Sequence, residues 1–179
     1  MQTSYATKLR AGFHRETIEA FYDGFRAARI DFAVFLPDSL LDGIEQHILE
    51  RGEIEAYQCS REDEGIAMAM GAYLVGRRPV VFMEGSGLGL SGLILARGIA
   101  QRTPTLIVAG HNLMFGERYD YHAATRMVGE PLLRALNIPY HVVMDPGEIR
   151  TVVVEAQHTV QGQRLPVALL VPTHLAREL

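Results

Sequence analysis

Short apolar runs alternate with amphipathic stretches along most of this chain. Between residues 14 and 29 apolar side chains recur every three or four positions, which predicts a helix, and the apolar run 32–36 predicts a buried strand. The same alternation continues towards the C-terminus. Strands are continuously apolar where helices cover both faces of a parallel sheet. The pattern predicts a three-layer α/β domain with a mainly parallel sheet of about six strands.

The expected elements can be placed along the chain from these periodicities. The strands are expected at 32–36, 54–58, 80–83, 105–109, 140–143 and 166–171, with helices at 14–29, 38–50, from the acidic motif to 74, 90–101, 130–136 and 146–160. Residues 110–129 are expected to be a long irregular segment. Open parallel sheets bind ligands beyond the carboxyl ends of their strands. The turns at Pro37, Gly85 and Gly110 and the start of the acidic helix are therefore expected to share the binding edge.

Composition narrows the class of function. The 179 residues are expected to form one domain, and a net charge of −4 without a cluster of Lys or Arg argues against a nucleic-acid partner. The apolar runs are too short to span a membrane and the N-terminus has no apolar signal core, so a cytoplasmic location is expected. The single cysteine, Cys59, excludes an internal disulfide and is expected to be buried and inert.

Three consecutive acids, Glu62, Asp63 and Glu64, begin a helix with almost no polar residues. Acids in a first helical turn complement the helix dipole, which would explain them as solvated residues without a further role. The helix that follows, up to Leu74, has hardly any polar face and is expected to be buried against other protein. The acids are then expected beside a cavity or an interface.

Five motifs follow one another in order along the chain. They are Pro37-Asp-Ser-Leu-Leu41, Arg61-Glu-Asp-Glu-Gly65, Gly71-Ala-Tyr-Leu74, Met83 with Ser86-Gly-Leu-Gly89, and Leu136-Asn-Ile-Pro-Tyr140. Together they resemble the pyrimidine-binding domain of thiamine-diphosphate enzymes, especially the family of sulfopyruvate decarboxylase alpha subunits and the matching half of phosphonopyruvate decarboxylase. The resemblance extends from about Glu16 to about Pro172. It implies a flavodoxin-like pyrimidine domain over 1–179 that serves decarboxylation of a 2-oxo acid, with carboligation as the alternative.

The resemblance also implies a partner. In these enzymes a second domain holds Mg²⁺ and the diphosphate with a Gly-Asp-Gly start and a downstream Asn. This chain carries neither, and no residue spacing indicates another metal site. The resemblance therefore implies that a separate diphosphate-binding beta subunit brings the magnesium, in an α2β2 or larger assembly, with thiamine diphosphate shared between the subunits.

For the cofactor, the resemblance implies a carboxylate at the helix start that hydrogen-bonds a ring nitrogen of the aminopyrimidine. Counting back from Gly-Ala-Tyr73 places it at Asp63, where the family usually has Glu; Glu64 is the second candidate and Glu62 also flanks the position. The following glycine-rich turn lacks the Lys-Ser/Thr ending of a P-loop, which disfavours a phosphate cradle. The residues that the resemblance assigns to cofactor contact are Asp63, Ser86, Gly87, Leu88 and Gly89.

The predicted substrate residues include the largest departures from the family. Asp38 and Ser39 are expected either to position a polar head group or only to cap a helix. The family carries Arg-Gly where this chain has His111-Asn112, which argues against a strongly anionic head group unless Arg118 replaces that arginine. Glu84, Gly85 and Leu90 also stand where the family favours Gln, Asn and Asn, which again concerns the substrate.

Two histidines are candidates for proton transfer. His122 is the first and His111 the second, and an ordinary structural hydrogen bond is the alternative for each. Two further functions stay open from sequence. One is a flavodoxin-like binding module without catalysis, and the other is a degenerate pyrimidine domain that serves as a structural partner. A neighbouring reading frame with Gly-Asp-Gly and a downstream Asn would favour the enzyme.

Overall fold

A computed structural model of the protein describes residues 12–112, 117 and 119–177. Its six strands form one sheet in the order β2-β1-β3-β4-β6-β5, and every neighbouring pair is parallel. This architecture confirms the predicted α/β class and the six strands. The strands are β1 (Phe32–Phe35), β2 (Glu55–Gln58), β3 (Pro79–Met83), β4 (Leu106–His111), β5 (Tyr140–Val142) and β6 (Val167–Pro172).

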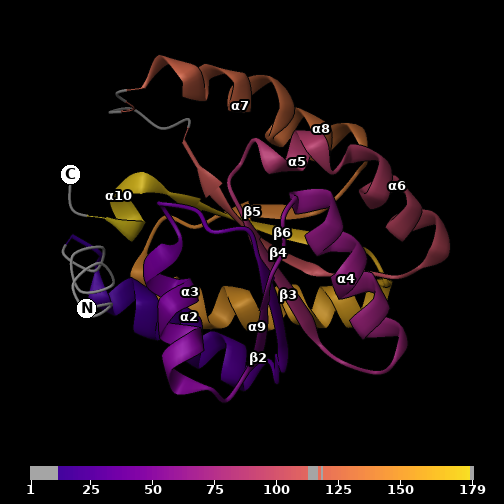
Figure 1. Cartoon of the computed structure of the whole chain (residues 1–179), viewed down its shortest axis with the longest axis horizontal. Coiled ribbons are helices and arrows are strands. Elements are labelled where there is room, and N and C mark those ends of the chain that lie inside the picture. The colour runs from indigo at the N-terminus through magenta and orange to yellow at the C-terminus, as the bar shows by residue number, and fades with distance from the viewer. Residues whose placement is uncertain (1–11, 113–116, 118, 178–179) are drawn as a thin grey trace.

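Helices cover both faces of the sheet (Figure 1). One layer contains α2 (Arg15–Ala27), α3 (Asp42–Arg51) and α9 (Ile149–Gln163), and the other contains α4 (Glu62–Leu74), α6 (Gly92–Gln101) and α8 (Glu130–Ala135). The remaining helices are short. They are α5 (Gly87–Leu90), η1 (Asp120–His122), α7 (Ala123–Val128), η2 (Pro146–Glu148) and α10 (Thr173–Ala176).

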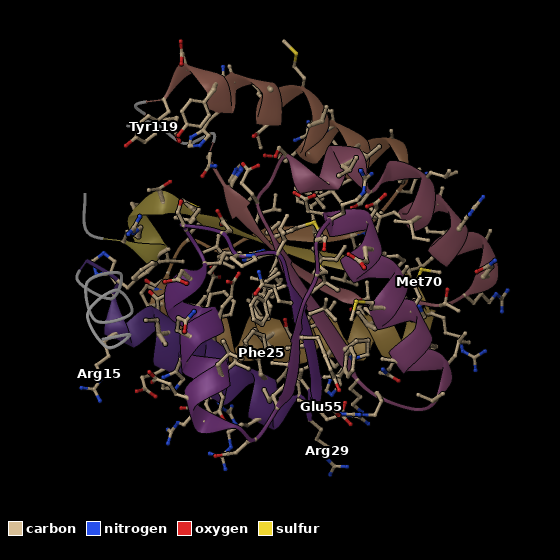
Figure 2. All side chains as sticks on the ribbon, in the orientation of Figure 1. Arg15, Phe25, Arg29, Glu55, Met70 and Tyr119 are labelled. Atoms are coloured by element: carbon tan, nitrogen blue, oxygen red, sulfur yellow. The ribbon has the colours of Figure 1, made fainter. Side chains whose placement is uncertain are left out.

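Each layer has its own apolar core against the sheet. Phe25 on α2 packs edge-on against Phe82 of β3, with ring centroids 5.7 Å apart. On the opposite face Ile66 and Met70 of α4 belong to a second cluster with Met83, and Figure 2 shows Phe25 and Met70 in the two layers. The three central strands β3, β4 and β6 are buried along their whole length because both faces are covered.

Two local predictions were wrong. Residues 120–128 are not irregular but form η1 and α7. The apolar pattern of α7 is too short to predict a helix, and Thr125 and Val128 are held by contacts with the glycines of the turn after β3. Helix α3 begins at Asp42 rather than near residue 38, so neither Asp38 nor Ser39 is its cap.

Cys59 is buried, as predicted, and burial raises the pKa of its thiol. The outer face of α4 is less covered than its apolar sequence suggests, because Leu74 is 70% and Val75 is 79% exposed. In the part of the chain that the structure describes, no helix has the length and apolar character needed to cross a bilayer.

Candidate functional site at the carboxyl edge of the sheet

The turns that follow β1, β3 and β4 lie against one another at the carboxyl edge. A Cβ atom on Gly85 would lie 2.4 Å from the carbonyl oxygen of Gly110, and a Cβ on Gly110 would lie 3.2 Å from Oδ2 of Asp38. A side chain at Gly85 would therefore collide with backbone that has little freedom to move. The two glycines allow the strand ends to approach closely, which places Asp38 and Glu84 at one edge, where such sheets bind ligands.

Glu84 connects three segments of this edge. Its Oε1 accepts hydrogen bonds from Nδ2 of Asn112 at 2.9 Å and from Oγ1 of Thr125 at 3.2 Å. Its Oε2 accepts from the backbone N–H of Ser86 at 2.9 Å and also from the Ser86 hydroxyl. The sequence assigned Glu84 no role beyond a departure from the family. Here its carboxylate joins the end of β3, the glycine-rich turn, the end of β4 and α7.

The three acids at the start of α4 have different surroundings. Glu62 lies against the glycine-rich turn, since a Cβ on Gly87 would come within 2.4 Å of its Cγ and 2.9 Å of its Oε1. Within the described residues no group donates a hydrogen bond to Glu62. All three atoms nearest to that position on Gly87 belong to Glu62.

Asp63 and Glu64 are engaged elsewhere. The guanidinium of Arg61 donates to both carboxylate oxygens of Asp63 at 2.9 and 3.1 Å, and this hydrogen bonding lowers the pKa of Asp63. Glu64 accepts from the backbone N–H of Ser60 at 2.8 Å. Both line an open pocket of about 450 Å³ between α4 and α6, whose wall also includes Leu93 and Leu90, the last residue of α5.

Helical geometry explains the difference. Glu62 precedes Ile66 by four positions and Ala69 by seven, so it shares the face of α4 that is buried against the sheet. Asp63 and Glu64 fall on the neighbouring outer faces. The periodicity of the sequence therefore places Glu62 on the buried face of α4, and Asp63 and Glu64 remain predictions for the cofactor carboxylate.

Asp38 lies in a buried, negatively charged environment. Burial raises its pKa to about 6, a nearby backbone N–H of Leu40 opposes this, and the charge of Glu84 raises it further while His122 lowers it. A carboxyl group with this pKa exchanges its proton close to neutral pH. Asp38 is therefore close enough to both Glu84 and His122 for their charges to change its pKa. Ser39, beside it, is exposed.

A second buried carboxyl group, Glu45 on α3, lies near Asp38. Glu45 is 1% exposed. Burial, followed by the charges of Asp38 and Asp42, raises its pKa to about 9. Sequence reasoning missed this residue, although it falls on the apolar face of α3 that Leu41, Ile44 and Ile48 define.

The predicted loop histidines lie in separate places. Nδ1 of His122 is 3.0 Å from Oε2 of Glu117, and His122 lines a pocket of about 350 Å³ together with Asn112 and Arg126. His111 is buried with its Nε2 3.5 Å from Oε1 of Glu130. Burial lowers the pKa of His111, against the opposing effect of the Glu130 charge.

Three further predicted residues are Asn112, Leu88 and Arg118. Asn112 is buried and hydrogen-bonded to Glu84, and the Leu88 side chain belongs to the apolar core rather than to the surface of the turn. Arg118 lies outside the described residues. Across those described residues, no three His, Cys, Asp or Glu side chains group as ligands of a metal would.

Comparison with known proteins gives relatives of one kind. No protein-family model matches the chain. The alpha subunit of sulfopyruvate decarboxylase from Methanothermobacter thermautotrophicus is 30% identical over 136 residues, which cover 75% of this chain and 82% of the relative. Those from Methanococcus maripaludis and Methanocaldococcus jannaschii are each 28% identical, covering 85% and 84% of this chain and 92% and 90% of those relatives.

A solved structure shares the fold. The 2-oxoglutarate:ferredoxin oxidoreductase from Magnetococcus marinus superposes with a TM-score of 0.71 and 18% identity over 90% of this chain, which spans 29% of the oxidoreductase chain. The fold and the carboxylate-lined edge thus define a three-layer α/β protein with a parallel six-stranded sheet. With the relatives above, the chain belongs to the family of sulfopyruvate decarboxylase alpha subunits.

Proposed function

We propose that this chain is the pyrimidine-binding subunit of a two-subunit, thiamine-diphosphate-dependent 2-oxo acid decarboxylase. The observation that carries the proposal is the carboxylate of Glu62, which lies against Gly87 at the ligand-binding edge of the sheet. The relatives support this reaction class because they are named as alpha subunits of a decarboxylase.

The residues of this edge fit one half of the cofactor. Glu62 is half-buried and has no hydrogen-bond donor among the described residues, so it is available to bond a ring nitrogen of an aminopyrimidine. Gly87 leaves the space that a larger side chain would fill. When bound, thiamine diphosphate supplies a nucleophilic carbon and an electron sink for loss of CO₂. Glu62 takes the relay role in place of Asp63, whose oxygens are occupied by Arg61.

Asp38 and His122 are proposed to act at the substrate end. With a pKa of about 6, Asp38 can hold or release a proton near neutral pH, and His122 lies close enough to influence that pKa. General acid or base catalysis is most effective when the catalytic pKa is near the working pH. Glu84 positions these groups by fixing the end of β3 against Asn112 and Thr125.

The substrate is proposed to be less anionic at its distal end than a sulfonate. His111 and Asn112 stand where the family has Arg-Gly, and both are buried, with His111 facing Glu130 and Asn112 bonded to Glu84. Neither can form the bidentate contact that an arginine makes with a sulfonate or phosphonate. Pyruvate is therefore expected to be a better substrate than sulfopyruvate, judged by kcat/KM.

A beta subunit is proposed to cover the start of α4 together with α5 and α6. Leu93 is 69% and Leu90 is 47% exposed there, and both line the pocket beside Asp63 and Glu64. Neighbouring exposed apolar side chains are typical of a protein interface. The beta subunit would contribute the residues that hold the diphosphate and Mg²⁺, in an α2β2 or larger assembly.

The first experiment is calorimetric titration of thiamine diphosphate with Mg²⁺ into this chain, into a candidate beta subunit, and into their mixture. We expect binding only in the mixture, together with release of CO₂ from a 2-oxo acid. If size-exclusion chromatography shows that the two chains assemble but the mixture does not bind the cofactor, this chain would be only a structural partner of the beta subunit. Tight binding of thiamine diphosphate to the carboxyl edge of this chain alone would refute the proposal that two subunits share the cofactor site.

A further inference from the structure

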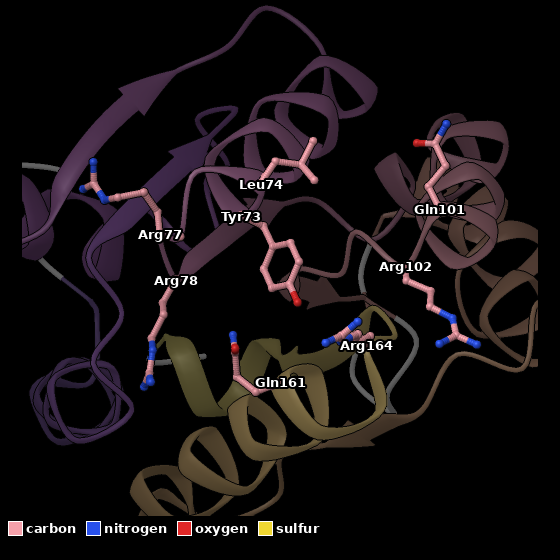
Figure 3. A pocket seen from close by; sticks show the side chains of 9 residues that line it. Tyr73, Leu74, Arg77, Arg78, Gln101, Arg102, Gln161 and Arg164 are labelled. Carbon is pink, nitrogen blue, oxygen red and sulfur yellow. The ribbon is translucent and has the colours of Figure 1, made fainter.

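A pocket of about 600 Å³ lies at the opposite, amino edge of the sheet (Figure 3). It is built where α4, α6 and α9 end and where the chain enters β3 and β4. Its lining contains four arginines and no acidic residue, in a chain whose net charge is −4. The positive charge of this pocket therefore opposes the charge of the molecule as a whole.

The guanidinium groups of three of the four arginines have no carboxylate partner among the described residues. Arg77 is neutralised by Asp31 and Glu55, at 3.0 and 2.8 Å, and Figure 3 shows it pointing away from the other side chains. For Arg102 and Arg164, no Asp or Glu among the described residues lies within ion-pair distance. Their charges are therefore available to a ligand.

Arg78 uses its backbone and its side chain differently. Its backbone N–H donates to Oδ1 of Asp31 at 2.8 Å, whereas its guanidinium donates to the carbonyl oxygen of Ala28 at 3.1 Å, which is uncharged. In Figure 3 the hydroxyl of Tyr73 is directed towards Arg164. No carboxylate lines the pocket, although Gln101 and Gln161 each carry an amide oxygen that accepts as well as an NH₂ group that donates.

Helix dipoles explain part of this arrangement. Arg102 and Arg164 follow α6 and α9 and have left-handed backbones, with φ of 55° and 54°. A cation there complements the negative end of the helix. Gln161 also lines the pocket, and its Nε2 is buried without a hydrogen-bond acceptor among the described residues.

We propose that this pocket binds a small multivalent anion of the phosphate class, such as a nucleotide or inorganic pyrophosphate. Guanidinium groups match phosphate oxygens through paired N–H donors and stay charged at any physiological pH. The volume falls within the range of pockets that hold small ligands. The site is on the opposite edge from Glu62 and is independent of the proposed decarboxylase function.

The test is calorimetric titration of inorganic pyrophosphate, and separately of ATP, into the full chain without thiamine diphosphate. We expect the double variant Arg102→Gly, Arg164→Gly to bind at least about ten-fold more weakly than the parent. Glycine suits a left-handed backbone at a helix end, so this variant keeps both helix ends intact. Arg29→Gly is the matched control because Arg29 also has a positive φ, 58°, but does not line the pocket.

Three outcomes would overturn the proposal. The first is no binding of either anion at millimolar concentration. The second is equal weakening by the double variant and by Arg29→Gly, which would indicate a general effect of net charge. The third is unchanged anion affinity with loss of co-purification of a beta subunit, which would make the arginines a protein interface. Weakening confined to the double variant supports the site, and its thiamine diphosphate binding in the assembled complex should be unchanged.

Discussion

The two edges of the sheet carry opposite charges. The carboxyl edge gathers Asp38, Glu62 and Glu84, and the amino edge gathers arginines such as Arg102 and Arg164. Because the helices run antiparallel to the strands, their N-termini face the first edge and their C-termini the second. Helix dipoles favour acids at N-termini and cations at C-termini, so the sign of each edge follows from the fold.

Burial distinguishes the two edges more than charge does. At the carboxyl edge, burial raises the pKa of Asp38 to about 6, and Glu84 is bonded on both oxygens. At the amino edge, Arg102 is exposed and its guanidinium has no acidic partner among the described residues. Buried carboxyl groups with raised pKa values suit proton transfer, whereas solvated guanidinium groups suit reversible binding of an anion.

The largest expected effect is on Glu62. In the assembled enzyme, Glu62→Gln should lower kcat about 100-fold or more, because Gln cannot exchange a proton with the cofactor ring. Asp63→Asn and Glu64→Gln should stay within about ten-fold of the parent. Steady-state decarboxylation and size-exclusion chromatography together measure this. If Asp63→Asn lost turnover while Glu62→Gln kept it, Asp63 would be the acting carboxylate, as counting back from Gly-Ala-Tyr73 predicts.

The next effect concerns the close approach of the strand ends. Gly85→Ala should lower the free energy of unfolding by about 2 kcal/mol, because its Cβ would lie 2.4 Å from a backbone oxygen. Gly71→Ala is the control, since nothing lies within 4 Å of a Cβ there and a helix interior favours alanine. Urea denaturation compares the two. Equal stabilities would mean that this edge is loosely packed.

The buried carboxyl group of Glu45 predicts a pH effect on stability. Its pKa is raised from 4.5 to about 9 in the folded chain, so unfolding releases a proton between those values and stability falls as pH rises through that window. Glu45→Gln has no proton to release on unfolding, so it removes this fall in stability at high pH. It should stabilise the chain at pH 8, by up to about 5 kcal/mol at about 1.36 kcal/mol per pH unit above 4.5, and have little effect at pH 4. Thermal denaturation across pH measures the difference; a pH-independent effect would contradict it.

The smallest effect concerns the amino edge. Arg164→Gly should raise the free energy of unfolding by about 0.5 kcal/mol, because glycine adopts the left-handed backbone at φ 54° without a Cβ penalty. Arg29→Gly should behave alike, and neither should alter decarboxylation. Urea denaturation of both variants measures the change: the midpoint concentration should rise while the slope of the free energy of unfolding against urea concentration stays the same. Destabilisation of Arg164→Gly alone would show that its guanidinium contributes to folding rather than only to ligand binding.

Most of the sheet was predictable from the sequence because buried strands and amphipathic helices have distinct periodicities. The predicted strand 80–83 corresponds to β3, Pro79–Met83, and 166–171 to β6, Val167–Pro172. The start of α3 and the helix α7 were not predictable in this way. Both depend on contacts with distant segments, such as the one between Thr125 and Gly85.

The sequence by itself determined the fold class, the order of the elements and the family, because these follow from periodicity and from motifs that are contiguous in the chain. Only the tertiary structure decided which acid faces the glycine-rich turn and that Glu84 joins Ser86, Asn112 and Thr125. Likewise, it brought Arg102 and Arg164 to one pocket. The physical reason is that side-chain direction and long-range contact depend on how the helices are seated on the sheet, which adjacent residues do not encode.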